Sequence, residues 1–426
     1  MEPNIRIKGF DGDWEQRSLG DIFSFQNGFN GGKEVYGSGI PLISVMDVLD
    51  DDFITYDKIR GKAEVSEEER ERFSVNYGDV LFQRSSENVE DAGTSNVYLD
   101  QDHTAVFGGF VIRGRGISEY DPKFMKYCLS APMVRNQFMK KAQGAQHVNI
   151  SQEVLQGIRI FEPSDAEQRK ISEMFSCLGQ QISLQQQKVS DLKELKKYML
   201  QKMFPKDGEK VPEIRFSGFE SEWEQQKLGD CFKFLQNNTL SRAELSTEAG
   251  VALNFHYGDV LIKYGEYLDT SSEQMVYIPD QSVVDKYKGS HLNNGDVIMA
   301  DTAEDETVGK CSEIAGLQGK TAISGLHTIP LRPVGKFAPG FLGYYMNSDA
   351  YHDQLLPLMQ GIKVTSVSKN AIRNTNVSYP LDTKEQTAIG KVFIRIDSLI
   401  THHQRKHDTL LEFKAYLLQN MFPKEG

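Results

Sequence analysis

Two stretches of about 40 residues carry a helical pattern of apolar positions, one in the middle of the chain and one at its end. Neither contains proline: the first lies between Pro163 and Pro205, the second between Pro380 and Pro423. Apolar residues recur at alternating steps of four and three, the spacing of a coiled-coil stripe. At 1.5 Å per residue, each stretch predicts a helix about 60 Å long. The first stripe comprises Ile171, Phe175, Leu178, Ile182, Gln185, Val189, Leu192, Lys196, Met199 and Met203, and the second comprises Ile389, Phe393, Ile396, Ile400, His403, His407, Leu410, Lys414, Leu417 and Met421.

Both stretches begin with a capping-box pattern, in which a side-chain oxygen and a glutamate accept the unpaired backbone N–H groups of the first turn. Because such helices are not stable alone, each stripe needs a partner. We expect the two helices to pair antiparallel, with Gln185, His403 and His407 near the middle as a register device. The alternative is that each stripe docks on its own globular domain. The capping-box residues are Ser164 with Glu167 and Asp382 with Glu385.

The chain is an internal duplication of one unit, a globular domain followed by a long helix. We therefore predict a domain over residues 1–163, a helical segment over 164–206, a second domain over 207–381 and a second helical segment over 382–426. The end of the chain stands where a third copy would begin, so we expect the two chain ends to lie close together. The matching segments are Arg6–Phe23 with Arg215–Phe232, Tyr77–Leu81 with Asn294–Ile298, Gln143-Gly144 with Gln360-Gly361, and Tyr198–Lys206 with Tyr416–Lys424.

The globular halves combine strand and helix patterns. Glycine-led apolar runs predict a turn followed by a strand, and helical apolar spacing follows in each half. The fold class expected from these patterns is α+β. The predicted strands are 78–82, 107–113, 258–262, 295–299 and 322–332, and the helical spacing lies in 124–138 and 341–346.

Composition is that of a globular protein, with 39% apolar and 25% charged residues. No apolar run is long enough for a transmembrane helix, and residues 1–14 lack the hydrophobic core of a signal peptide. The four cysteines are scattered, so we expect neither disulfides nor a thiolate zinc site, and a cytoplasmic location. The net charge is -12, whereas nucleic-acid binders are usually basic. A DNA-facing surface must then be a local patch, or partners must supply phosphate contacts.

Catalytic signatures are missing. Gly319-Lys320-Thr321 resembles the end of a phosphate loop, but Ile314 occupies the position of the required first glycine. His403 and His407, four residues apart, could bind a metal on one helix face, but no third ligand is evident and both fall on the stripe. No Asn-Pro-Pro-Tyr methyltransferase motif occurs. We expect no catalytic centre and no metal.

The two copies differ most where a binding surface would be. Residues 24–76 show no clear similarity to 233–293, and the loop 143–149 differs from 360–366. One frame with two sets of side chains suits two readers of different targets, and Gln, Asn, Arg and Lys are the side chains that pair with base edges. Each could equally be an ordinary solvated residue. The candidates are Gln83, Arg84, Gln143, Gln146, His147, Asn149, Lys263, Tyr264, Lys320, Gln360 and Lys363.

These motifs, in this order and twice over, resemble the specificity (S) subunit of type I restriction–modification systems. Each motif is weak alone; together they cover nearly the whole chain. The residues that carry the resemblance are Trp14-Glu15 and Trp223-Glu224, Leu19-Gly20-Asp21 and Leu228-Gly229-Asp230, the Gly-Asp-Val turns at 78 and 295, Glu167-Gln168 and Glu385-Gln386, and the Met-Phe-Pro-Lys exits at 203 and 421.

The resemblance implies two target-recognition domains separated by two long antiparallel helices, and no catalysis by this chain. It implies double-stranded DNA, two methyltransferase subunits and restriction/translocase subunits as partners, with S-adenosylmethionine, ATP and Mg on those partners. Each domain would read one half of a bipartite, asymmetric DNA site, and the helices would set the spacer between the halves. The alternatives are a protein–protein scaffold that does not bind DNA, which the acidic balance favours, and a standalone nuclease, which the missing carboxylate cluster disfavours.

Overall fold

The structure is a computed structural model that describes residues 2–142, 148–206 and 208–424. Contacts divide the chain into two compact units: unit 1 comprises residues 1–187 and 404–426, and unit 2 comprises residues 188–403. Each of the long predicted helices therefore contributes residues to both units.

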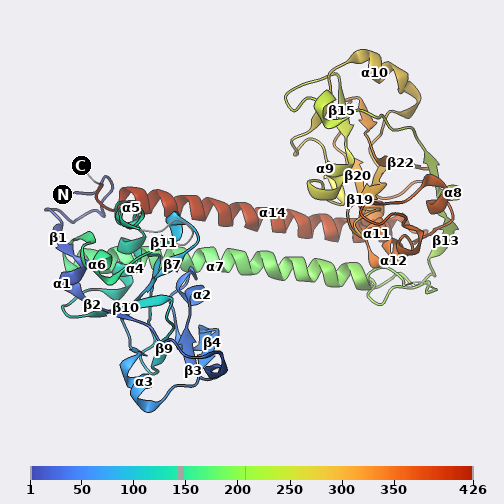
Figure 1. Ribbon diagram of the computed structural model, residues 1–426. Coiled ribbons are helices and arrows are strands. Elements are labelled where there is room, and N and C mark those ends of the chain that lie inside the picture. The colour runs from blue at the N-terminus through green and yellow to red at the C-terminus, as the bar shows by residue number, and fades with distance from the viewer. Residues whose placement is uncertain (1, 143–147, 207, 425–426) are drawn as a thin grey trace. The chain divides into compact units, whose positions relative to one another are not determined.

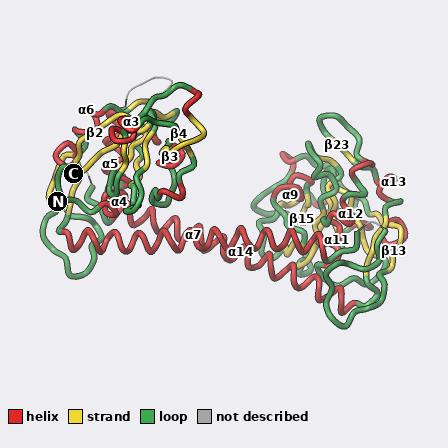
Figure 2. Tube along the Cα trace, turned by 90° about the horizontal axis from the view of Figure 1, so that it is seen from below, coloured by secondary structure: helices red, strands yellow, loops and turns green. Residues whose placement is uncertain are grey.

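The two long helices are present as α7 (Asp165–Lys202) and α14 (Thr383–Asn420), each of 38 residues. In unit 1 the ring of Phe175, early in α7, lies 6.1 Å from that of Phe422, just after α14. In unit 2 the ring of Phe204, just after α7, stacks on Phe393, early in α14, at 5.9 Å. In each unit the start of one helix thus lies beside the end of the other, as Figures 1 and 2 show, and the antiparallel pairing is confirmed.

The apolar stripes pack on the globular cores as well as on each other. Phe175 stacks on Tyr127, and Phe393 stacks on Tyr344, with ring centroids 4.8 and 4.9 Å apart. Pairing and docking, the two alternatives for the stripes, therefore occur together. The stripe residues Ile171, Phe175, Leu178, Ile182, Ile389, Phe393, Ile396 and Leu417 are buried, and Leu192, Met199, Ile400 and Leu410 are half-buried.

The described residues of unit 1 form two four-stranded sheets and two strand pairs. The first sheet is antiparallel, with the order β2 (Phe23–Asn27), β10 (Val111–Gly116), β6 (Val80–Gln83) and β8 (Ser95–Val97). The second has the order β4 (Gly61–Ala63), β3 (Tyr36–Ile43), β9 (Ala105–Phe107) and β5 (Ser74–Val75). The pairs are β1 (Glu15–Ser18) with β12 (Arg159–Glu162), and β7 (Ser85–Ser86) with β11 (Val148–Asn149).

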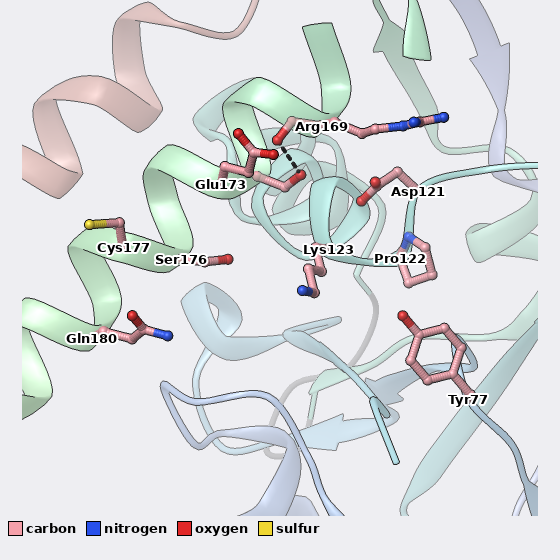
Figure 3. Close-up of a pocket in the computed structure, with 10 residues that line it drawn as sticks. Tyr77, Asp121, Pro122, Lys123, Arg169, Glu173, Ser176, Cys177 and Gln180 are labelled. Atoms are coloured by element: carbon pink, nitrogen blue, oxygen red, sulfur yellow. Dashed lines mark hydrogen bonds between the residues drawn. The ribbon is translucent and has the colours of Figure 1, made fainter. Parts of the chain in front are cut away.

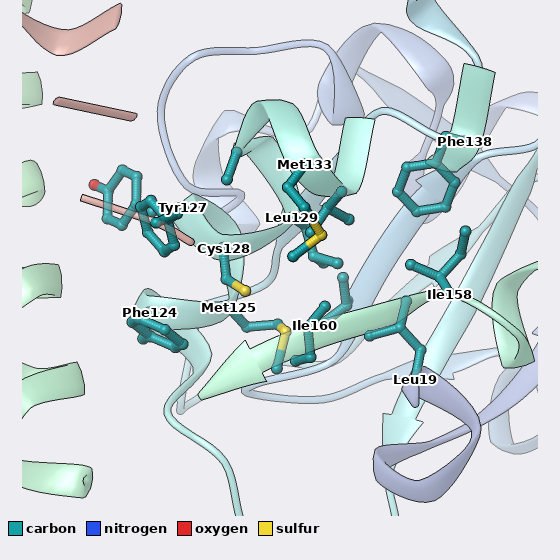
Figure 4. Close-up of a cluster of buried hydrophobic side chains, with 14 of the residues drawn as sticks. Leu19, Phe124, Met125, Tyr127, Cys128, Leu129, Met133, Phe138, Ile158 and Ile160 are labelled. Atoms are coloured by element: carbon teal, nitrogen blue, oxygen red, sulfur yellow. The ribbon is translucent and has the colours of Figure 1, made fainter. Parts of the chain in front are cut away.

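The main core of unit 1 lies between the first sheet and the helices that follow it. Figure 4 shows another part of this core, in which Met125 and Leu129 of the helices lie beside Ile160. All four residues of β6 are buried because this strand lies inside the sheet with packing on both faces, which explains its continuous apolar run. The short helices of the unit are α1 (Leu19–Ile22), α2 (Val45–Val48), α3 (Glu67–Arg72), α4 (Pro122–Ser130), α5 (Pro132–Lys141) and α6 (Gln152–Gln156).

Unit 2 repeats this plan with one longer sheet. Its five strands are ordered β14 (Phe232–Phe234), β22 (Thr328–Pro333), β18 (Val297–Ala300), β20 (Cys311–Ala315) and β16 (Tyr267–Asp269). A three-stranded sheet contains β17 (Val276–Ile278), β15 (Ala252–Phe255) and β21 (Ala322–Ser324), and the pairs are β13 (Glu224–Lys227) with β24 (Asn376–Tyr379) and β19 (Thr302–Ala303) with β23 (Thr365–Ser366). The helices are α8 (Leu228–Cys231), α9 (Tyr257–Ile262), α10 (Gln281–Lys286), α11 (Phe341–Met346), α12 (Asp349–His352) and α13 (Lys369–Ile372). The predicted α+β class is confirmed.

The Gly-Asp-Val turns are structural devices. Gly78 has φ +90°, a conformation that glycine adopts without steric cost. The buried Asp79 carboxylate accepts the Asn76 backbone N–H at 2.9 Å and the Arg115 guanidinium at 2.7 Å, which ties the turn to the neighbouring strand. Gly295, Asp296, Asn293 and Arg332 form the same arrangement in unit 2.

The glutamates predicted to complete the capping boxes have another partner. Glu167 is buried and accepts the Arg6 guanidinium at 2.8 Å, and Glu385 accepts that of Arg215 at 2.7 Å. A buried carboxylate is stabilised more by a charged donor than by a neutral backbone N–H. The prediction that these side chains cap their helices is therefore wrong, and they hold the opening segment of each copy instead.

The chain ends meet inside unit 1. The backbone N–H of Ile5 donates to the carbonyl of Asn420 at 2.9 Å. The same bond joins Ile214 to Lys202 within unit 2, at 2.8 Å, where the chain runs on without a break. The expected closeness of the two ends is thus observed.

Three predicted strands differ in the structure. Residues 258–262 belong to helix α9, which begins where the His256 Nδ1 accepts the Gly258 N–H at 3.2 Å; this local cap outweighs the β-propensity of the apolar run. Residues 107–113 and 322–332 each form two strands joined by a turn, at 108–110 and 325–327.

Helices α4 and α11 occupy matching places but join their sheets differently. In unit 1 the buried Lys126 ammonium donates to the carbonyls of Asp51 and Asp52 and to the Asn96 side chain, at 2.7 to 2.9 Å. In unit 2 the matching residue is Gly343, whose N–H donates to the buried Glu313 carboxylate at 3.0 Å. A β-carbon at Gly343 would collide with the Glu266 carbonyl oxygen.

A half-buried ionic cluster joins α7, α14 and the β16 edge in unit 2. The Lys196 ammonium lies 2.8 Å from Glu266 and 2.7 Å from Asp397, and the Tyr344 hydroxyl donates to Asp397 at 2.6 Å. Burial opposes the charge of Lys196, but the two carboxylates outweigh burial and raise its pKa. Lys414, at the matching position of unit 1, has no ion pair among the described residues.

Replacing Lys196 by methionine should destabilise the protein because two partly buried carboxylates lose their cation. Breaking a fully buried pair costs about 3–5 kcal/mol; Glu266 and Asp397 keep some solvent, so we expect a loss of about 2 kcal/mol in the free energy of unfolding. Urea denaturation of the full chain measures it. Lys414→Met is the matched control, with an expected loss of at most about 0.5 kcal/mol, and equal losses in the two variants would contradict this account.

Candidate nucleic-acid interface

A short two-stranded arm projects from the end of β6 in unit 1. Its strands β7 and β11 pair Ser85 with Asn149 and Ser86 with Val148. Arg84 connects β6 to the arm, and its carbonyl accepts the Ile150 N–H at 2.9 Å. Arg84 and Asn149, two of the predicted candidates, are therefore neighbours at the base of one arm.

Beside this arm lies a hollow of about 370 Å³ lined by Asn27, Arg84, Asn149 and residues 150–154. The Arg84 guanidinium donates to the Gly109 carbonyl at 3.3 Å, which holds it near the turn that contains Phe110. A hydrogen bond from the Ser151 side chain lowers the pKa of Glu153, so an ionised carboxylate also lines the hollow. Guanidinium, amide and carboxylate groups together match the donors and acceptors of base edges.

Unit 2 has the corresponding arm, formed by β19 and β23, with Thr302 paired to Ser366 and Ala303 to Thr365. Two backbone hydrogen bonds between Gln360 and Ser366, of 3.0 and 2.9 Å, extend it to a tip at residues 361–364. Gln360 and Lys363 are exposed there. The structure thus brings two more of the predicted candidates together.

The arm of unit 2 is attached through Asp301, which stands where unit 1 has Arg84. Its carboxylate lies 3.4 Å from the His327 Nδ1, and its carbonyl accepts the Val367 N–H at 2.9 Å. His327 in turn meets the Tyr257 ring edge to face at 5.2 Å. Asp301 and His327 are not among the candidates predicted from the sequence. The spacing between the two Gly-Asp-Val turns, applied to Arg84 and Phe110, identifies both positions.

We call these two surfaces the arm faces. The arm face of unit 1 comprises Asn27, Arg84, the turn 108–110, and the β7–β11 arm. The arm face of unit 2 comprises Asp301, His327 and the β19–β23 arm with its tip at 361–364. Equivalent positions of the two faces carry different side chains: Arg84 of unit 1 matches Asp301 of unit 2, and Phe110 matches His327.

Two predicted candidates are not on either surface. Gln83 is 5% exposed, and its Nε2 donates to the Ser85 carbonyl at 3.0 Å. Tyr264 is 2% exposed, and burial raises the pKa of its hydroxyl. Neither side chain is accessible, so the prediction that they contact DNA is wrong for both. Gln83 directly follows an apolar run and Tyr264 follows one after Lys263, and the chain turns both side chains into the core.

The remaining candidates lie elsewhere or are not described. Lys263 is exposed after α9, and its ammonium donates to the Gln274 carbonyl. Lys320 lies in the turn after β20, at the opposite end of the antiparallel β18–β20 pair from the β19 arm. Gln143, Gln146 and His147 lie outside the described residues.

A second hollow in unit 1, of about 440 Å³, lies between the start of α4 and α7 (Figure 3). Lys123 and Arg169 line it together with Asp121 and Glu173. A hydrogen bond from Lys170 lowers the pKa of Glu173, so this carboxylate is ionised beside the cations. The mixed charge favours neither an anion nor a cation.

Within the described ranges, no three His, Cys, Asp or Glu residues are placed to hold a metal ion. Burial raises the pKa of the Cys128 and Cys311 thiols, which disfavours the thiolate that nucleophilic chemistry needs. No helix of the described chain has the length and apolar character to cross a membrane.

Comparisons with known proteins agree with this anatomy. Residues 11–194 match the family model described as the type I restriction modification DNA specificity domain. A curated protein of Methanocaldococcus jannaschii, named as the MjaX specificity subunit of a type I restriction enzyme, is 23% identical over 224 residues. That match covers 51% of this chain and 52% of the relative, so the aligned part spans about half the length of each.

Two solved structures share the fold. The S subunit of a type I restriction–modification system from M. genitalium is similar over 100% of both chains, with a TM-score of 0.58 and 14% identity. A chain from a study of complex assembly and conformational transition of the type I R-M system is similar over 96% of this chain and 97% of its own length, with a TM-score of 0.54 and 14% identity. Residues 11–194, which lie in the first copy of the duplicated chain, thus match a type I restriction modification DNA specificity domain, and the whole chain shares its fold with these two solved structures.

Proposed function

We propose that this chain is the DNA-recognition subunit of a type I restriction–modification complex, reads a bipartite asymmetric site and positions the methyltransferase and restriction subunits on it. The observation that carries the proposal is the pair of arm faces. The frame beneath them is the same in both units, down to the Asp79–Arg115 and Asp296–Arg332 pairs. The arm faces themselves differ at matching positions. A common frame with unlike surfaces fits two readers of unlike half-sites.

The chemistry of the arm faces supports different base preferences. Arg84 and Asn149 are the side-chain types that pair with guanine and adenine in the major groove, whereas Asp301 is an acceptor for the cytosine amino group. Lys363 at the tip of the second arm is placed for a phosphate or a guanine. The two half-sites should therefore differ in sequence.

We infer that α7 and α14 set the length of the unread spacer. Each helix contributes residues to both units, so the number of residues in α7 and α14 would determine the length of helix that connects the two arm-bearing domains. At 1.5 Å per residue, one heptad corresponds to about 10.5 Å, or about three base pairs of duplex.

The partners and cofactors follow from this role. Two methyltransferase subunits and the restriction/translocase subunits would bind S-adenosylmethionine, ATP and Mg, and this chain would hold none of them and catalyse no step. Partner contacts to phosphates would offset the net charge of -12. The complex would act on chromosomal DNA in the cytoplasm.

The alternative is a protein–protein scaffold without DNA, which the acidic balance favours. A gel-shift assay with co-expressed methyltransferase subunits separates the two. Preference for a subset of many DNA sites supports recognition, and the absence of any preference supports the scaffold.

Replacing residues 25–162 with the corresponding domain of another family member should change one half of the methylated motif and leave the other half intact. The unit 2 reader and the helices are untouched by this exchange. Single-molecule sequencing of methylated genomic DNA reads the motif directly. Exchange of residues 234–379 is the matched control and should change the other half only; a change in both halves, or in neither, would sink the two-reader assignment.

Deleting one heptad from each long helix, residues 184–190 and 402–408, should shorten the spacer by about three base pairs and keep both half-sites. Seven residues preserve the phase of the apolar stripe. The same methylation sequencing gives the spacer length. The control replaces these residues by another heptad of the same apolar pattern and keeps the helix length. An unchanged spacer in the deletion variant would refute the proposal that the helices set the spacer length.

A further inference from the structure

Each arm face displays the most exposed large apolar side chain of its unit. Among the described residues of unit 1, Phe110 has the greatest exposure, 69%. Among those of unit 2, Ile362 at the arm tip has the greatest, 101%. Two independent units therefore place their least covered apolar group on the surface that the proposed function assigns to DNA.

The turn that carries Phe110 is held rigidly. Its carbonyl accepts the Arg84 N–H at 2.9 Å, and the next residue, Val111, donates to the Gly108 carbonyl at 2.9 Å and accepts the Gly28 N–H at 3.2 Å. These bonds fix the backbone at Phe110, and the side chain attached there is 69% exposed. Its ring thus projects from a fixed point beside the Arg84 guanidinium.

Ile362 is presented in a similar way. The two backbone hydrogen bonds between Gln360 and Ser366 close the arm below it, and Gly361 takes φ +127° to turn the chain. A β-carbon at Gly361 would collide with the Val364 carbonyl, so the tip is tight. Lys363 follows Ile362 directly and is exposed as well.

The surroundings of the two side chains argue against a protein-docking patch. Protein-binding patches are contiguous apolar areas of several hundred Å², whereas Phe110 stands beside Arg84, and the exposed Ile362 and Val364 are separated along the second tip by Lys363. An exposed apolar side chain beside a cation has the chemistry of a DNA wedge: the cation meets a phosphate, and the apolar group enters between two base pairs and unstacks them.

We propose that Phe110 and Ile362 are apolar wedges, each of which enters the base stack of its own half-site. The inference rests on the proposed function. An opened base step lowers the cost of extruding a neighbouring base, so the wedges would assist the flipping that methylation requires.

The test uses the assembled methyltransferase complex after methylation sequencing has given its motif. Duplexes containing that motif carry 2-aminopurine in place of one adenine, or pyrrolo-cytosine in place of one cytosine, at each pair in turn. The wild-type complex should raise the fluorescence at one step of each half-site because unstacking relieves quenching. Phe110→Ala should abolish the signal in one half-site, Ile362→Ala in the other, and each should weaken DNA binding about tenfold.

Ile117 and Val334 provide matched controls. They are 62% and 70% exposed and follow the far ends of β10 and β22, so they test exposure without the arm face. Ile117→Ala and Val334→Ala should keep both signals and the affinity. All four variants should assemble with the methyltransferase subunits and melt like the wild type.

The outcomes distinguish a failure of the proposed function from a failure of the wedge assignment. A complex that methylates no bipartite motif overturns the proposed function itself. A motif with wild-type fluorescence in Phe110→Ala and Ile362→Ala, or signals lost equally in the control variants, overturns the wedges alone. Loss of subunit assembly in the two wedge variants also overturns them, because it would make these side chains a protein contact.

Discussion

The structure depends on the aromatic side chain that follows each long helix. Phe204 and Phe422 are both buried, and each closes the core of the unit in which its helix ends. Phe422 lies against Trp14 and Phe175, which joins the opening segment, the start of α7 and the end of α14 at one point. Since neither long helix is stable alone, these junctions make the globular cores and the helix pair interdependent. Each core contains side chains from the start of one long helix and from the end of the other, so each core needs both helices.

This interdependence explains which parts of the two copies agree. The residues that agree, such as Asp79 with its arginine or Glu167 with Arg6, hold buried charges whose loss would leave an unpaired ion in the core. The arm faces carry no such obligation because their side chains meet solvent. These buried ion pairs constrain the frame but not the surface, and the two arm faces differ in side-chain chemistry at matching positions.

The architecture was predictable because its signals are long and repeated. The stripe from Ile171 to Met203 runs over nine turns, and the duplication tests every assignment twice. Short local signals were less reliable: the run at 258–262 reads as a strand, yet a histidine cap makes it helical. Part of the candidate site was predictable from the sequence. Arg84 and Asn149 lie together on the arm of unit 1, and Gln360 and Lys363 lie together on the arm of unit 2. Polarity alone could not tell that Gln83 points into the core.

Residues missed by the sequence analysis fall where chemistry gives no warning. Asp301 and His327 are not typical DNA-binding residues, and an exposed phenylalanine in an apolar run, as at 110, reads as core. Only the turn that splits the predicted strand brings Phe110 to the surface. Backbone geometry of this kind depends on contacts from distant segments, here Gly28, which no local pattern encodes.

Helix α4 contacts the segments beneath it through Lys126, whereas α11 does so through Gly343, and this difference limits how the two copies can evolve. A lone Lys126→Gly would strand the carbonyls that this ammonium holds, and a lone Gly343→Lys would drive a side chain into backbone. Gene conversion between the halves is therefore blocked at this helix unless the loop or strand beneath it is copied in the same event. At this helix the two copies can therefore become alike again only when both layers of the contact change together.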